Sequence, residues 1–142
     1  MKADLHNHSY YSDGVLSPTE VVRLASKAEC NLFSLTDHDT TDGIAEAQLE
    51  ANKLNLSLVN GVEISALWRN ITIHILGLGI DVNNDILQTG LEHNQKLRKE
   101  RAEKIALGLW RSGIKDALEK TQSFSKTEML TRTHFAQMLI SE

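Results

Sequence analysis

The sequence predicts an α/β fold with a parallel sheet in its first half. Short apolar segments that are typical of buried strands alternate there with segments of helical periodicity. Clusters of polar and turn-forming residues separate these segments. Because strands that alternate with helices of about ten residues form βαβ units, we expect the strands to run parallel. After Gly79 the pattern changes, and residues 81–142 are predicted to be mainly helical.

Four strands are predicted in the first half, at residues 2–6, 31–35, 56–65 and 70–79, and the third is expected to be interrupted at Gly61. A first helix begins at the capping box SPTE (17–20), in which Ser17 and Glu20 satisfy free backbone amides. Its buried face should carry Val21, Leu24, Ala25 and Ala28, and Asn31 should adopt the left-handed turn after it. A second helix is predicted near residues 43–54.

Two helices are predicted in the second half. Asn84 or Asp85 caps a long helix that ends near Arg111. A second capping box, SKTE (125–128), predicts a helix that continues through Leu139.

The composition is that of a globular protein. Of 142 residues, 41% are hydrophobic and 24% are charged, which excludes a disordered chain. No apolar run approaches the roughly 18 residues of a membrane span, and the N-terminus lacks the apolar core of a signal peptide. The one cysteine, Cys30, excludes an internal disulfide. We expect a cytoplasmic protein with no membrane partner.

The two halves of the chain differ in charge. Residues 1–63 hold ten acidic against four basic residues, a net charge of −6, whereas residues 64–142 hold nine against eleven, a net charge of +2. Much of the basic charge lies in one stretch: Lys96, Arg98, Lys99, Arg101 and Lys104. An acidic half suits cations and a basic stretch suits anions, although a solvated helix face would show the same charges.

Six side chains are candidate metal ligands. His6 and His8 lie two apart along a strand and therefore point to the same side, which is a chelating geometry. Two surface histidines would be the simpler explanation for this pair alone. Four further candidates follow at or near strand ends: Asp13, His38, Glu63 and His74. Loops at the carboxyl ends of parallel strands assemble active sites, and imidazoles mixed with carboxylates suit Mn, Fe or Zn better than Ca or Mg.

Four motifs, DLHNHSYYSDG (4–14), LTDHDT (35–40), GVEIS (61–65) and IHILGLG (73–79), resemble those of the PHP (polymerase and histidinol phosphatase) superfamily of metal-dependent phosphoesterases. TRTHFAQML (131–139) is similar to a segment of one branch, which contains nucleoside 3′,5′-bisphosphate phosphatases and the 5′-to-3′ exoribonuclease RNase AM. The resemblance implies the first part of a distorted (β/α)7 barrel over residues 1–80. It implies a helical, substrate-binding insertion over residues 81–142.

The resemblance also implies ligand roles. His6 and His8 would hold one metal, Glu63 would bridge it to a second that His74 also holds, and Asp13 and His38 would hold a third. We therefore expect two or three divalent cations in a complete site, with Mn favoured over Zn, Fe or Mg. Catalytic roles are expected for His38, Glu63 and Asp37, although Asp37 is equally compatible with a role in orienting His38 or with a solvated loop position.

Later ligands of the superfamily have no counterpart here, because residues 75–142 contain no Asp-x-His pair. We therefore expect the C-terminal part of the barrel to be absent, and an apolar sheet face to lack its cover. Arg98, Arg101 and His134 are candidate substrate-binding residues, since guanidinium groups suit phosphate. Thr133 departs from the proline that relatives commonly place before this histidine.

The predicted activity is hydrolysis of a phosphate ester by metal-activated water. The expected substrate is a nucleoside 3′,5′-bisphosphate or the 5′ end of a short RNA, with no DNA partner. Two alternatives stay open: a catalytically incomplete fragment that binds metal or nucleotide, and an enzyme that resembles histidinol phosphatase.

Overall fold

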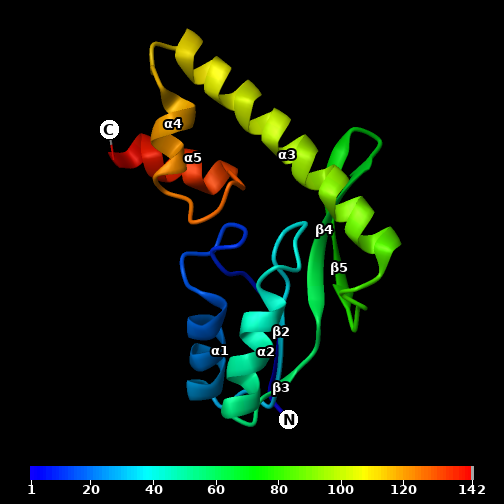
Figure 1. Ribbon diagram of the computed structural model, residues 1–142. Coiled ribbons are helices and arrows are strands. Elements are labelled where there is room, and N and C mark those ends of the chain that lie inside the picture. The colour runs from blue at the N-terminus through cyan, green and yellow to red at the C-terminus, as the bar shows by residue number, and fades with distance from the viewer. Residues whose placement is uncertain (142) are drawn as a thin grey trace.

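The computed structural model describes residues 1–141. Its elements follow one another as Figure 1 shows: β1 (Ala3–Asn7), α1 (Pro18–Lys27), β2 (Leu32–Leu35), α2 (Ile44–Lys53), β3 (Ser57–Leu58), β4 (Gly61–Trp68), β5 (Ile71–Leu78), α3 (Asp85–Arg111), α4 (Ala117–Gln122) and α5 (Arg132–Ser141). The first three strands and two helices alternate, so the α/β prediction for this half is confirmed.

Strands β1, β2 and β3 form a parallel sheet in that order. Helices α1 and α2 lie side by side against it (Figure 1). Apolar side chains of both helices and of the sheet form one hydrophobic cluster: Val22, Ala25, Phe33, Leu35, Ala47, Ala51 and Leu56. Burial of this cluster stabilises the layer from which the first candidate ligands extend.

Helix α1 begins as predicted but buries a different face. The Ser17 side chain accepts a hydrogen bond from the Glu20 amide, and the Glu20 carboxylate accepts one from the Ser17 amide. Ala25 is buried as predicted and Val22 is fully buried, whereas Leu24 is 52% exposed and Ala28 is exposed, so the buried face is shifted by a partial turn from the predicted one. The left-handed residue after the helix is Glu29, with φ 58°, and not Asn31.

The segments predicted as the third and fourth strands are arranged differently in the structure. Residues 59–60 separate the short strand β3 from β4, and β4 pairs with β5 as an antiparallel hairpin. Only Arg69 and Asn70 connect β4 to β5, and both have positive φ. Positive φ at both central residues is the requirement of a tight type I′ turn. No helix lies between β4 and β5, so these strands run antiparallel and not parallel.

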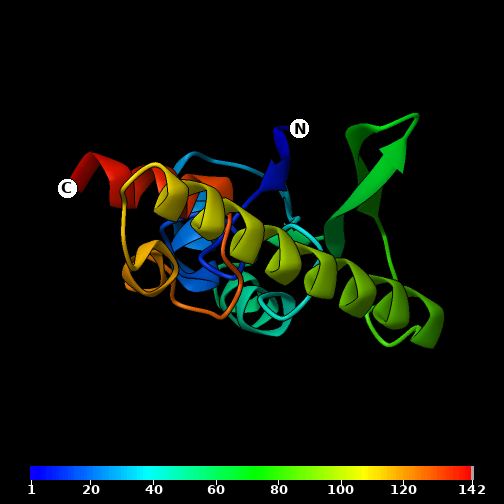
Figure 2. The ribbon, with the colours of Figure 1, turned by 90° about the horizontal axis from the view of Figure 1, so that it is seen from above.

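One face of the β4–β5 hairpin is apolar and exposed. Trp68 pairs with Ile71, Ala66 with Ile73 and Ile64 with Ile75. Trp68 is 61% exposed and Ile71 is 65% exposed. Within residues 1–141, nothing covers this face over most of its length, as the view in Figure 2 makes plain.

The helical half packs around α3, which runs above the sheet from the hairpin to α4 and α5 (Figures 1 and 2). A second hydrophobic cluster joins the three helices and the segment before α5: Ala102, Ala117, Leu130, Phe135 and Met138. The predicted capping box at 125–128 is wrong, since Ser125 instead bonds to Thr127 and Met129 in an irregular loop. Helix α5 starts only at Arg132. Among residues 1–141, no helix is both long and apolar enough to cross a membrane.

Gly61 permits the close approach of β4 to the end of β2. A Cβ atom at this position would collide with the side chains of Ser34 and Thr36. We predict that Gly61→Ala lowers the free energy of unfolding by about 1–3 kcal/mol, because overpacking forces the strands apart. Gly90→Ala is the control, since nothing lies within 4 Å of its added Cβ, and in a helix alanine should stabilise by up to about 1 kcal/mol. Urea denaturation of both variants measures this, and equal stabilities would contradict the predicted crowding.

Candidate metal centre

Six side chains from both sheets meet above the carboxyl ends of β1 and β2. His6 lies in β1 and His8 just after it, Asp13 lies in the following loop, and His38 lies in the loop after β2. Glu63 comes from β4 and His74 from β5. The six predicted ligands are thus brought together from positions up to 68 residues apart.

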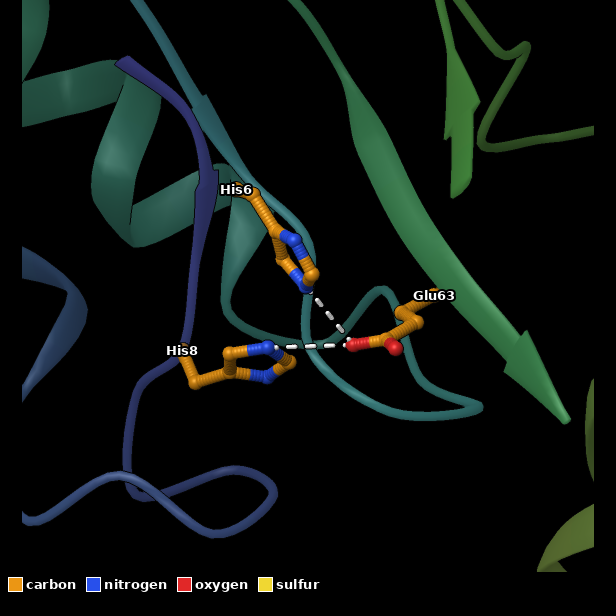
Figure 3. A group of neighbouring side chains, drawn as sticks. All are labelled: His6, His8 and Glu63. Carbon is orange, nitrogen blue, oxygen red and sulfur yellow. Dashed lines mark hydrogen bonds and ion pairs between the residues drawn. The ribbon is translucent and has the colours of Figure 1, made fainter. Parts of the chain in front are cut away.

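The Glu63 carboxylate is at the centre of this group. Its Oε2 lies 2.9 Å from His6 Nε2 and 3.1 Å from His8 Nε2 (Figure 3). The same oxygen lies 3.4 Å from His38 Nδ1, and Oε1 lies 3.5 Å from His74 Nδ1. One carboxylate therefore contacts four imidazoles with its two oxygen atoms.

Backbone pairing places Glu63 beside His38. These two residues form an isolated parallel bridge beyond the end of β2. The Glu63 amide donates to the Asp37 carbonyl at 3.1 Å, and the Asp39 amide donates to the Glu63 carbonyl at 3.0 Å. Because both polar groups of the Glu63 backbone are hydrogen-bonded, the backbone position from which its side chain extends is fixed.

The hairpin register places His74 near Glu63. His74 lies opposite Ser65, and Glu63 is two residues from Ser65 on the same strand. Side chains two apart share one face of a strand, so Glu63 and His74 are diagonal neighbours on the face opposite the exposed isoleucines.

The donor atoms form three sets, and within each set all the atoms lie within 4.8 Å of one another. The sets are His6, His8 and Glu63; His8, Asp13 and His38; and His38, Glu63 and His74. Asp13 is the outermost donor, since its carboxylate lies 3.6 Å from His8 Nδ1 and 3.8 Å from His38 Nε2. His8, His38 and Glu63 each belong to two sets, so neighbouring cations would share ligands or be close together.

The state of the imidazoles fits metal binding. His38 Nδ1 is buried and makes no hydrogen bond within the described residues. Burial, together with repulsion from Arg98, lowers the pKa of His38 to about 4, although Asp13 and Glu63 oppose the shift. Burial raises the pKa of Glu63, but the hydrogen bond from His6 and the other imidazoles lower it overall. A neutral imidazole beside an ionised carboxylate is the donor set that Mn, Fe or Zn accepts.

Asp37, predicted as catalytic, does not face the donor group. It is 2% exposed, and its carboxylate accepts hydrogen bonds from the Ser9 amide and hydroxyl and from the Ser12 hydroxyl. Burial raises the pKa of Asp37, while the bonds from Ser12 and Ser9 lower it. Asp37 therefore holds the loop that carries His8 and Asp13, and these contacts favour a positioning role for Asp37 over the predicted catalytic one.

Three arginines line a cavity of about 100 Å³ next to the donors. The cavity is lined by Asp13, His38, His74, Arg98, Arg101, Thr131, Arg132 and Thr133. Arg98 already binds Asp39 and Ser65 through its side chain, so it is not a free phosphate ligand. Burial, with repulsion from Arg98 and Arg132, lowers the pKa of Arg101. Arg132 was not among the predicted substrate-binding residues, although it directly precedes the TH pair of the TRTHFAQML motif.

His134 is not a lining residue of this cavity. It is 3% exposed, and its Nδ1 accepts a hydrogen bond from the Thr131 amide at 3.2 Å. Burial lowers the pKa of His134, against attraction from Asp13. Direct contact with a substrate was predicted for His134, but its ring is buried and fixes the turn that carries Thr131 and Arg132.

The parallel layer and the group of histidines and carboxylates define an α/β protein with a candidate polynuclear metal site. Residues 4–103 match the model of the PHP domain. The chain belongs to this family.

Similar proteins bear names from one branch of it. The chain is 42% identical over 138 residues to the 3′,5′-nucleoside bisphosphate phosphatase of Chromobacterium violaceum, covering 96% of this chain and 48% of that protein. It is 40% identical to the 5′-3′ exoribonuclease Rnm of Escherichia coli, covering 96% of this chain and 47% of that one. The chain spans about half the length of these relatives.

Two solved structures share the fold. One is an amidohydrolase from Chromobacterium violaceum with bound sulfate and no metal, with a TM-score of 0.94 and 41% identity over 99% of this chain and 50% of that one. The other, from Bifidobacterium adolescentis, is named as a metal-dependent phosphoesterase, with a TM-score of 0.87 and 25% identity over 99% of this chain and 50% of that one.

Metal binding should depend on the central carboxylate. We predict that Glu63→Gln and His8→Ala each weaken Mn²⁺ binding more than about 10-fold, since loss of an outer partner alone has an effect of that size. Glu63→Gln should be the more severe, because Glu63 contacts four imidazoles. His93→Ala is the control, since His93 is exposed on α3. Titration with Mn²⁺, followed by metal analysis of the dialysed protein, measures this. Full metal content in Glu63→Gln would contradict the central role of Glu63.

Proposed function

We propose that this chain carries the metal site of a phosphoesterase that hydrolyses nucleotide phosphate esters. The proposed substrates are nucleoside 3′,5′-bisphosphates or the 5′ ends of short RNAs, as the names of the relatives suggest. One observation carries the proposal: four imidazoles surround Glu63 directly beside a cavity lined by arginines.

The donor sets assign the residues that would hold cations. His6, His8 and Glu63 would hold one, His38, Glu63 and His74 a second, and His8, Asp13 and His38 a third. Divalent cations, of which Mn²⁺ is our first candidate, would lower the pKa of a bound water and neutralise charge on the phosphoryl oxygens. Glu63 and His38 would thus act as ligands at the reacting centre.

Arg101 and Arg132 are proposed to bind phosphate at the cavity. They lie next to Arg98, and no hydrogen bond or ion pair of Arg101 is found within residues 1–141. Guanidinium groups that have no carboxylate within ion-pair distance favour a multiply charged anion. Arg98 and His134 were predicted as direct ligands. They are proposed instead to fix the positions of Arg101 and Arg132.

The finer fold assignment is also a proposal. Residues 1–80 would form the first part of a distorted (β/α)7 barrel, and residues 81–142 a helical insertion that binds substrate. Two separate hydrophobic clusters, one on each side of residue 80, support this division. A second candidate function is binding of metal and nucleotide without turnover. It is favoured by the donor sets, each of which has three donors among the described residues.

Phosphate release separates the two candidates. We expect the chain with Mn²⁺ to release inorganic phosphate from adenosine 3′,5′-bisphosphate. Glu63→Gln should lower this rate by at least about 100-fold, since it removes a shared ligand of the metal site. A chain that binds Mn²⁺ and the bisphosphate but releases no phosphate would establish the second candidate instead.

The arginine cavity predicts selectivity for a second phosphate. Arg101→Ala should weaken binding of adenosine 3′,5′-bisphosphate about 10-fold, because the charge-assisted pair with its second phosphate is lost. Binding of adenosine monophosphate, which lacks that phosphate, should weaken much less. Lys104→Ala removes the same charge from an exposed position of α3 and is the control. Calorimetric titration in the presence of Mn²⁺ measures both. Equal losses for the two ligands would contradict a separate phosphate subsite.

A further inference from the structure

Asp39 is a fully buried carboxylate that connects three parts of the molecule. Its Oδ1 accepts hydrogen bonds from the Ser65 amide of β4 and from the Asn94 side chain of α3. Its Oδ2 accepts one from Arg98 Nε at 2.5 Å, and its carbonyl accepts one from the Gln95 side chain. Asp39 thus accepts hydrogen bonds from three polar side chains within five residues of α3, those of Asn94, Gln95 and Arg98.

The same residue is joined to the donor group through the backbone. Asp39 directly follows His38, and its amide donates to the carbonyl of Glu63. Arg98, the charged partner of Asp39, also donates to the Ser65 hydroxyl. One buried ion pair therefore lies between the candidate metal ligands on one side and helix α3 on the other.

Helix α3 also carries Arg101, less than one turn beyond Arg98. Residues three apart on a helix lie on neighbouring surface, so whatever sets the position of Arg98 also sets that of Arg101. Moreover, α3 has few other buried side chains, namely Leu91 and Ala102. The attachment of this helix to the sheet layer depends mainly on hydrogen bonds, of which Asp39 accepts three, Ser65 two and Thr41 one.

We propose that Asp39 is a positioning residue, which holds α3 at a fixed distance from the metal ligands and so aims Arg101 at the second phosphate of a substrate. The claim about Arg101 rests on the proposed function, whereas the claim about α3 does not. Asp39 itself touches neither substrate nor metal; it acts through Arg98 and the helix.

The isosteric variant Asp39→Asn tests this contact selectively. Asp39 has φ 53°, in the left-handed region, which asparagine tolerates as well as aspartate does. The asparagine oxygen can still accept from Ser65 and Asn94, but its amide nitrogen would face Arg98 Nε, donor against donor. The variant therefore removes the hydrogen bond from Arg98 and leaves the backbone conformation unchanged.

We expect hydrogen exchange of the α3 amides around Arg98 to accelerate at least about 10-fold in Asp39→Asn, because a buried charge loses its partner. The affinity for adenosine 3′,5′-bisphosphate in the presence of Mn²⁺ should fall about 10-fold. The affinity for Mn²⁺ alone and the exchange of amides in α1 and α2 should stay unchanged.

Glu50→Gln is the matched control. Glu50 is a buried carboxylate, 4% exposed, that pairs with Arg23 and Lys53 on the far side of the layer. Its loss should accelerate exchange in α1 and α2, leaving α3 exchange and bisphosphate affinity as in the wild type. A general loss of stability is thereby separated from a loss of position.

The double variant Asp39→Asn with Arg98→Gln is the rescue. Its asparagine amide can donate to the glutamine oxygen, which replaces the ion pair by a neutral hydrogen bond. Slower α3 exchange than in Asp39→Asn alone would support the proposal, because two independent losses would add.

Three results would overturn it: unchanged α3 exchange in Asp39→Asn, faster exchange with unchanged bisphosphate affinity, or a fall in Mn²⁺ affinity as large as that for the bisphosphate. If the wild-type chain binds Mn²⁺ but no bisphosphate, the proposed function fails, and with it the role of Arg101. The exchange measurements would still decide whether Asp39 holds α3.

Discussion

The short parallel pairing between the start of β4 and the segment after β2 is the constraint on which the candidate site depends. Glu63 is held from both sides there, by the Asp37 carbonyl and the Asp39 amide. This pairing brings a strand of the hairpin against the end of the parallel layer. Without it, Glu63 and His74 would have no fixed relation to His6, His8 and His38. Gly61 makes the approach possible because no side chain separates β4 from Ser34 and Thr36.

Three consecutive residues after β2 have three different tasks. Asp37 points into the first loop and binds Ser9 and Ser12. His38 points toward Glu63 and the other imidazoles. Asp39 points toward α3 and pairs with Arg98. Each carboxylate is buried and fully hydrogen-bonded, which is the condition under which buried charge is tolerated. The acidic first half and the basic stretch of α3 are therefore joined by one specific ion pair, Asp39 with Arg98, in addition to the attraction between their opposite net charges.

The two faces of the hairpin carry different groups. One face presents Glu63 and His74 to the donor group and also carries exposed leucines, while the other exposes Trp68 and a row of isoleucines. Alternation along a strand makes this division unavoidable, since neighbouring residues point to opposite sides.

Much of the local structure follows from sequence neighbours alone. The capping box at Ser17, the alternation of strands with helices and the choice of six donor side chains all depend on residue types at short spacings. Periodicity and capping act over one or two turns, so they can be recognised without knowledge of the fold. The hairpin of β4 and β5 was missed because the third strand was predicted to end at residue 65, before the turn at Arg69 and Asn70, and because the parallel arrangement of βαβ units was extended to two strands with no helix between them.

Only the tertiary structure decided what the remaining polar residues do. Asp37 and Asp39 are indistinguishable in the sequence, yet one binds a loop 25–28 residues before it and the other a helix 55–59 residues after it. The packing of α3 likewise made Arg98 a buried partner while leaving Arg101 at the cavity, and burial removed His134 from its lining. The sequence by itself determined which donors this protein has. Long-range packing decided which of them face a common point, because side chains distant along the chain meet only where the folded backbone brings them together.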